Sequence, residues 1–224
     1  MSGRGRGLGA AALVLGVVGL VLGFGSFGYA RTAYGGSVVQ GSSMSPTYVR
    51  GDRVFFERVD GTQVRRGDVV LFSAPDRYGF TADVMNRVIG VGGDHVVCCT
   101  GGGSGAQVSV NGKPLQEPYV KDGDADGADK AYDVTVPKGR LFLLGDYRAN
   151  ANDSRFFAAD HGGTVPVSAV QGRVTQSHSA LVLIVVGMLA GVVSVLVGLG
   201  LGIAALAVRR RKAVPPVPPA PVRA

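Results

Sequence analysis

The sequence predicts an all-β extracytoplasmic domain flanked by two transmembrane α-helices. Two long apolar runs, residues 8–30 and 180–208, contain no charged side chain. The region between them alternates short β-type runs with turn residues, which is typical of all-β domains. All sixteen acidic residues lie in this middle region, between Asp52 and Asp160. Hydropathy and charge therefore divide the chain at the same places.

The charges outside the middle region are all positive. Sixteen Lys and Arg residues, from Arg31 to Arg173, balance the acidic residues of the middle region, which is formally neutral. The other seven cations lie in the two tails and account for the net charge of +7 and the pI near 9.7. A neutral folded region offers no basic stripe for a phosphate backbone, so nucleic acid is not an expected partner.

Each apolar run exceeds the roughly 20 residues that a helix needs to cross the hydrocarbon core of a bilayer. Arg4 and Arg6 precede the first run and a basic cluster at 209–212 follows the second, so the positive-inside rule places both tails in the cytoplasm. The expected organisation is a cytoplasmic tail at 1–7, a span at 8–30, an extracytoplasmic domain at 31–179, a span at 180–208 and a cytoplasmic tail at 209–224. The alternative for the first run is a cleaved signal peptide ending in Gly28-Tyr29-Ala30, but the run is longer than an apolar signal region of about 7–15 residues.

Both spans contain glycines four residues apart, at Gly19/Gly23, Gly187/Gly191 and Gly198/Gly202. Such spacing can let two helices approach closely. Glycine is also common in membrane helices generally, and this second interpretation is favoured. The Pro-rich end from Pro215 lacks the composition of a packed core and is expected to be disordered.

Seven short runs in the middle region have the composition of β-strands. They are residues 54–56, 68–72, 87–91, 95–99, 107–110, 132–136 and 140–144. Asn111-Gly112, placed between Val110 and Lys113, predicts a tight hairpin. The Gly-rich segments 101–105 and 122–129 are expected to be mobile loops, and the second lacks the spacing of a calcium-binding EF-hand.

Cys98 and Cys99 are adjacent and face an oxidising compartment in the expected topology. Neighbouring Cα atoms across a trans peptide are about 3.8 Å apart, which is below the usual range for a disulfide. A vicinal disulfide is possible, but two packed thiols are favoured. The histidines His95, His161 and His178 have no ligand-like spacing, so neither a metal nor another cofactor is expected.

Four ordered motifs carry the most specific signal in the chain. They are Gly41-Ser42-Ser43-Met44-Ser45-Pro46-Thr47, Gly51-Asp52, Arg87-Val88-Ile89-Gly90 with Gly93-Asp94, and Gly145-Asp146 with Asn150 and Asp153-Ser154-Arg155. In this order after an N-terminal anchor, they resemble the motifs of type I signal peptidases. The resemblance covers Leu8 to about Val174, and the cysteine doublet and the second span are similar to actinobacterial members.

The resemblance implies a serine endopeptidase that cleaves signal peptides of exported precursors after Ala-x-Ala-like sites. It also implies an all-β fold in which the peptide lies in an extended groove and adds as a strand. By position, Ser43 matches the nucleophile, and its backbone N–H with a donor near Gly41 matches the oxyanion hole. Met44 matches a residue that lines the substrate pocket.

Three further residues match supporting positions of the family. Asp153 and Arg155 match a structural pair near the site. Asp146, after Gly145, would shape the approach of the bound strand.

The sequence departs from the family at the two positions that handle the proton. The family's general-base lysine matches Asn86, and the serine that orients this lysine matches Ala151; the family's asparagine after Gly-Asp matches Tyr147. An amide cannot hold a proton at neutral pH, so Asn86 cannot replace a lysine. A substitute base among Lys113, Lys121, Lys130, Lys138 and His95 is the alternative.

Two functions therefore remain open. The first is a working signal peptidase with an unrecognised base or with slow residual turnover. The second, which the chemistry of Asn86 favours, is a catalytically inactive pseudo-peptidase. It would bind signal peptides or associate in the membrane with a paralogous signal peptidase or the secretion machinery. In both, the partners are signal peptides and membrane lipid.

Overall fold

The computed structural model describes residues 3–100, 105–175 and 179–212. It forms two compact units, of which one contains the two long helices and the other is the β domain. The predictions for residues 101–104, for His178 and for the Pro-rich end from Pro215 lie outside the described residues.

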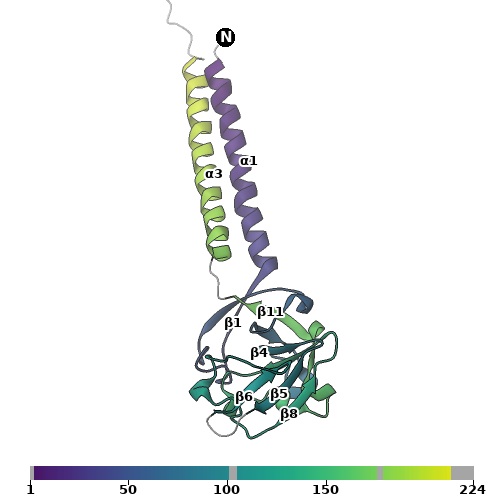
Figure 1. Cartoon of the computed structure of the whole chain (residues 1–224). Coiled ribbons are helices and arrows are strands. Elements are labelled where there is room, and N and C mark those ends of the chain that lie inside the picture. The colour runs from purple at the N-terminus through teal and green to yellow at the C-terminus, as the bar shows by residue number, and fades with distance from the viewer. Residues whose placement is uncertain (1–2, 101–104, 176–178, 213–224) are drawn as a thin grey trace, which may run out of the picture. The chain divides into compact units, whose positions relative to one another are not determined.

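The two apolar runs form the helices α1 (Gly3–Ala33) and α3 (Ser179–Lys212) (Figure 1). Both are long and apolar enough to cross a membrane, over Gly7–Ala33 and Ser179–Arg210. Many of their large apolar side chains, such as Leu13 and Leu183, are exposed. In water this exposure would be unfavourable, whereas in a bilayer these side chains contact lipid.

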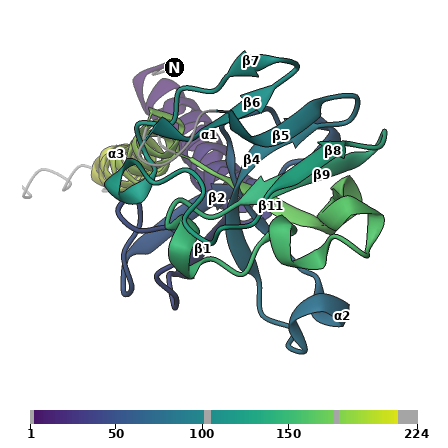
Figure 2. The same cartoon turned by 60° about the horizontal axis from the view of Figure 1, so that its bottom comes forward.

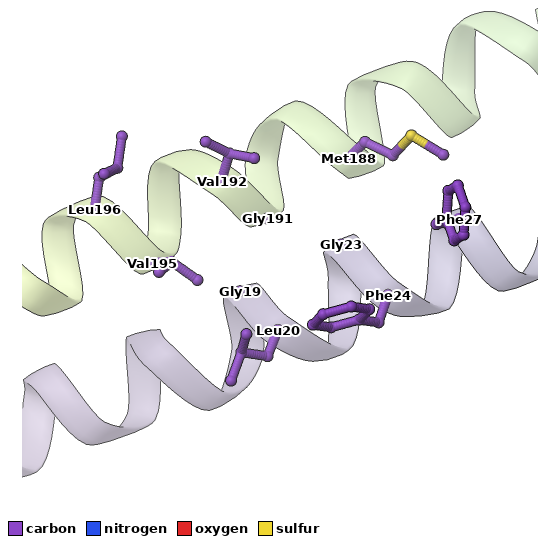
Figure 3. Close-up of a pocket in the computed structure, with 10 residues that line it drawn as sticks. All are labelled: Gly19, Leu20, Gly23, Phe24, Phe27, Met188, Gly191, Val192, Val195 and Leu196. Atoms are coloured by element: carbon purple, nitrogen blue, oxygen red, sulfur yellow. The ribbon is translucent and has the colours of Figure 1, made fainter.

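The two helices pack against each other through glycines, so the interpretation as mere membrane-helix composition is wrong for Gly19, Gly191 and Gly198. Figure 3 shows Gly19 and Gly23 of α1 beside Gly191 of α3. A Cβ at Gly19 would lie 2.6 Å from the carbonyl oxygen of Gly191, and one at Gly191 would lie 2.7 Å from the backbone nitrogen of Gly23. A Cβ at Gly198 would lie 2.9 Å from the carbonyl oxygen of Ala12, whereas one at Gly202 would be in ordinary contact, 3.8 Å from the Cβ of Ala12. Close approach of the two backbones thus requires glycine at specific positions.

The β domain consists of two antiparallel sheets (Figures 1 and 2). The seven-stranded sheet has the order β1-β2-β11-β3-β4-β9-β10, and the four-stranded sheet has the order β7-β6-β5-β8. The strands of the first sheet are β1 (Tyr34–Val38), β2 (Arg53–Glu57), β11 (Val170–Val174), β3 (Val69–Phe72), β4 (Val84–Val91), β9 (Arg140–Leu144) and β10 (Val165–Pro166). Those of the second are β7 (Lys113–Pro114), β6 (Gln107–Val110), β5 (His95–Thr100) and β8 (Tyr132–Thr135). The short helix α2 (Pro75–Tyr78) lies between β3 and β4 along the chain.

All seven predicted strands are present, and the predicted hairpin joins β6 to β7, with positive φ angles at Asn111 (53°) and Gly112 (75°). The strands that the sequence did not reveal include β1 and β11, which contain Gly35 and Gly172. A Cβ at either glycine would lie within 2.4 Å of the Phe56 ring. The aromatic ring thus covers both glycines and supplies the packing that their own strands lack.

The described core has three clusters. One, centred on Ile89, Val96 and Phe142, joins the two sheets. A second, containing Val70, Val88 and Leu143, lies on β3, β4 and β9. The third packs Met44 against Val39, which follows β1, and against residues of β2, β3 and β11; it supports the turn that carries Ser43.

The expectation of two separate thiols at Cys98 and Cys99 is corrected, because the structure joins them in a vicinal disulfide. That expectation assumed a trans peptide, whereas the peptide between them is cis and their Cα atoms are 2.9 Å apart. Asp126 lies close to both sulfurs, but paired sulfurs are not thiolates and do not act as thiolate metal ligands.

The acidic segment 122–129 also differs from the expected mobile loop. Ala125 is buried against the core that joins the sheets, and its carbonyl accepts a hydrogen bond from Arg148 Nη1 (3.0 Å). Arg155 Nη1 donates to the carbonyl of Asp126 (2.8 Å). Buried guanidinium groups therefore anchor this segment.

Candidate active site

Ser43 lines a groove of about 560 Å³ in the β domain. One wall is formed by β1 and the segment that follows it, including Val38 and Gly41; the other is formed around the start of β4, including Val84 and Met85. β1 is the edge strand of its sheet. A groove beside an edge strand allows an extended peptide to add as a further strand.

The turn that carries Ser43 is anchored by the buried side chain of Met44. Met44 is buried in the core with Val39, Val54 and Leu71. Its carbonyl accepts a hydrogen bond from the N–H of Tyr48 (2.9 Å). The structure thus places Met44 beneath the turn, whereas Ser43 is half-buried and faces the groove.

Two motifs that are distant in sequence meet at Gly145. The N–H of Tyr147 donates to the carbonyl oxygen of Ser43 (2.8 Å). A Cβ at Gly145 would lie 2.7 Å from that same oxygen and 2.4 Å from the Cβ of Ala151. Only glycine lets the serine turn and the loop of Ala151 come together here.

Asn86 lies on β4 next to this meeting point. It pairs with Val70 of β3, and the neighbouring Arg87 pairs with Leu144 of β9. Continuing that register by one residue places Asn86 opposite Gly145. Its side chain is 1% exposed, and its Nδ2 has no hydrogen-bond partner within the described residues. Leaving a buried donor without a hydrogen-bond partner lowers the free energy of unfolding by about 1–3 kcal/mol.

Asp153 and Arg155 form the pair that the sequence predicted. Arg155 Nε donates to Asp153 Oδ1 (2.8 Å) and Arg155 Nη2 donates to Oδ2 (2.8 Å). The two side chains are 0% and 1% exposed. Asp153 Oδ2 also accepts a hydrogen bond from the N–H of Gly145 (3.1 Å). The pair therefore fixes the position of Gly145, where the serine turn contacts the loop of Ala151.

A second buried pair, Arg87 with Asp146, was not predicted. Arg87 Nε and Nη2 donate to the two carboxylate oxygens at 2.8 and 2.6 Å, and Thr47 Oγ1 donates to Oδ2 (2.5 Å). Burial by itself lowers the pKa of Arg87, but the hydrogen bond and the charge of Asp146 raise it above its ordinary value. The pair ties the serine turn to the arginine motif. The signal available in the sequence was the opposite charge of Arg87 and Asp146, each inside one of the ordered motifs.

Two further contacts hold the loop 147–153. Asn150 Nδ2 donates to Ser42 Oγ (2.7 Å). Tyr78 donates its hydroxyl to the carbonyl of Asn152 (3.0 Å). Burial raises the pKa of Tyr78 to about 12, so the phenol stays protonated and remains a donor at neutral pH.

Lys121, one of the residues considered as substitute bases, contacts Tyr147, whose backbone N–H donates to the carbonyl oxygen of Ser43. Its ammonium lies 3.8 Å from the centroid of the Tyr147 ring, and its N–H donates to the carbonyl of Asp146 (3.0 Å). His95, in contrast, lies on β5 with Nε2 2.5 Å from Asp133 Oδ1.

Comparison with known proteins identifies the family. The family model described as "Signal peptidase, peptidase S26" matches residues 10–178. A "Probable signal peptidase I" of Mycobacterium leprae (strain TN) is 34% identical over 139 residues, which are 49% of this chain and 46% of that protein. The chain thus spans about half of that relative. The "Signal peptidase I" of Bacillus caldolyticus is 33% identical over 150 residues, covering 61% of this chain and 75% of that protein.

A crystal structure of a signal peptidase I from Enterococcus faecalis V583 is 27% identical, with a TM-score of 0.38. It aligns with 50% of this chain and 97% of its own. The family model by itself covers well over half of the sequence. The chain therefore belongs to the type I signal peptidase family, peptidase S26.

Proposed function

We propose that this protein is a catalytically inactive member of its family that binds signal peptides of exported precursors in the groove beside Ser43. The observation that supports this function is the residue at the base position. Asn86 is buried there, its amide nitrogen has no partner in the described chain, and it lies opposite Gly145, where the serine turn and Ala151 meet.

A serine hydroxyl at its free pKa is a weak nucleophile and needs an adjacent base to take its proton. In this family a desolvated lysine does so, because burial favours its neutral form. An amide oxygen accepts hydrogen bonds but does not hold a proton at neutral pH. Ala151 offers a methyl group where an orienting hydroxyl would stand. The groove, the edge strand and the glycine contact at Gly145 remain, and they are the parts that hold a peptide.

The second candidate is an active serine endopeptidase in which Lys121 serves as the base. The contact of Lys121 with Tyr147, whose N–H donates to Ser43, favours it. Against it, an ammonium over an aromatic ring is stabilised as a cation, whereas a general base must be neutral.

A single assay separates the two functions. The full-length protein in lipid vesicles is incubated with a secretory precursor that carries an Ala-x-Ala site and a photoreactive residue beside it. We expect crosslinking without cleavage, and we expect Ser43→Ala to crosslink as well as the wild type. Cleavage that disappears in Ser43→Ala would show an active enzyme, and absence of crosslinking would exclude the binding function.

The role of Lys121 is tested in the same assay with Lys121→Met, with Lys113→Met in the β6–β7 hairpin as the matched control. If cleavage occurs and only Lys121→Met removes it, the second candidate is correct.

The proposed binding site requires an extracytoplasmic β domain, because signal peptides are processed on that side of the membrane. Reporter fusions after Gly112 should therefore be active only in an extracytoplasmic environment, and fusions after Lys212 only in the cytoplasm. The confinement of all acidic residues to the region between the helices motivates this expectation. A cytoplasmic signal at Gly112 would contradict the topology and the proposed function together.

A further inference from the structure

The helix pair carries an apolar groove at its basic end. We name it the basic-end groove; it has a volume of about 580 Å³ and is lined on α1 by residues from Gly9 to Leu20 and on α3 by residues from Val195 to Arg209. The groove shown in Figure 3, of about 490 Å³, adjoins it and shares Leu20 and Val195. No charged residue lines the groove of Figure 3, whereas Arg209 lies at the end of the basic-end groove.

The length of the basic-end groove matches one leaflet of a bilayer. The α1 residues that line it extend from Gly9 to Leu20, and at 1.5 Å per residue this corresponds to about 16 Å. The hydrocarbon core is about 30 Å thick, so each leaflet contributes about 15 Å. A single acyl chain would therefore fill the groove from the headgroup level to the middle of the bilayer.

The charge at its end is suited to an anion. The nearest atom to a Cβ built at Gly9 is Nη2 of Arg209, at 3.7 Å, so the guanidinium reaches across to α1 where glycine leaves room. Arg209 and Arg210 are both exposed, and neither forms a salt bridge within the described residues. All acidic residues of the chain lie between Asp52 and Asp160, outside both helices. Basic sites between helices at this depth attract anionic lipid headgroups.

We propose that the basic-end groove binds one anionic phospholipid, with an acyl chain between α1 and α3 and the phosphate on Arg209. A phospholipid explains both features, because it has one apolar chain of leaflet length and one negative group at the end. A third membrane helix would also cover the adjoining groove of Figure 3, and it would bring no negative group to Arg209.

The test uses the full chain in mild detergent and native mass spectrometry with added phosphatidylglycerol or phosphatidylcholine of identical acyl chains. We expect one phosphatidylglycerol per chain, bound at least about fivefold more tightly than phosphatidylcholine. Arg209→Gln should remove this preference. Arg210→Gln removes the same charge one residue away and should largely keep it. If both variants lose the preference equally, binding depends on general surface electrostatics, and the proposed site is overturned.

The acyl-chain part is tested with Gly16→Leu, which fills the groove. A Cβ at Gly16 meets no atom within 4 Å, so the helix pair should tolerate the change. Binding of both lipids should fall about tenfold or more, whereas Gly200→Leu, equally free of neighbours and outside the groove, should leave binding unchanged. Unchanged binding in Gly16→Leu would exclude the groove. A two-chain species without bound lipid would show that a second copy occupies it, and this would also overturn the proposal.

Discussion

Replacing Asn86 by lysine and Ala151 by serine in the same chain is expected to raise the rate of precursor cleavage by about 10²- to 10⁴-fold, the usual contribution of a general base. The site at position 86 is almost fully buried, so an introduced lysine would be desolvated and its neutral form favoured. A hydroxyl at position 151, beside Gly145 and the serine turn, would orient its amine toward Ser43. Single-turnover cleavage of an Ala-x-Ala precursor measures the gain.

The two single substitutions should gain much less. Without the serine, the amine of the new lysine lacks its partner, and a misplacement of about 1 Å can cost on the order of 10²-fold in rate. The double variant should thus exceed the product of the single gains, because the two groups act as one unit. Adding Ser43→Ala must abolish the gained activity, whereas adding Lys121→Met should leave it unchanged. A double variant that is folded, inserted and still inert would show that the groove cannot present a scissile bond to Ser43.

Asp153→Ala should lower the free energy of unfolding of the β domain by about 3–5 kcal/mol, the usual cost of removing one partner of a buried ion pair. Arg155 would be left buried without its carboxylate, and the N–H of Gly145 would lose its acceptor. Thermal unfolding of the full chain in detergent, followed by circular dichroism in the β region, measures the loss.

Two substitutions serve as controls for Asp153→Ala. Glu57→Ala breaks the pair with Arg173, whose side chains are 36% and 32% exposed, and exposed pairs contribute about 0–1 kcal/mol. Ser43→Ala changes one half-buried hydroxyl in the groove and should also cost little. If Asp153→Ala and Ser43→Ala shift the melting temperature equally, the buried pair does not support the site.

The sequence was sufficient wherever a signal is local. Apolar length predicted both long helices, short runs of β-type composition between turn residues predicted seven strands, and Asn111-Gly112 predicted its hairpin. The ordered motifs around Ser43, Arg87 and Gly145 indicated the family. Each of these features depends on residues that are neighbours in the chain, so no knowledge of the fold was needed. The sequence also shows directly that position 86 is an asparagine, where the resemblance to the family implies a lysine.

The tertiary structure decided which distant residues meet. Arg87 and Asp146 are 59 positions apart, and only the pairing of β4 with β9 brings them together. Lys121 reaches Tyr147 because its backbone N–H bonds to the carbonyl oxygen of Asp146, 25 positions away, which no local pattern encodes. Whether a glycine of α1 or α3 lies in a tight interhelical contact depends on how the two helices face each other. Contacts of this kind follow from strand register and helix rotation, which depend on the packing of the whole unit, whereas element type depends mainly on the residues within the element.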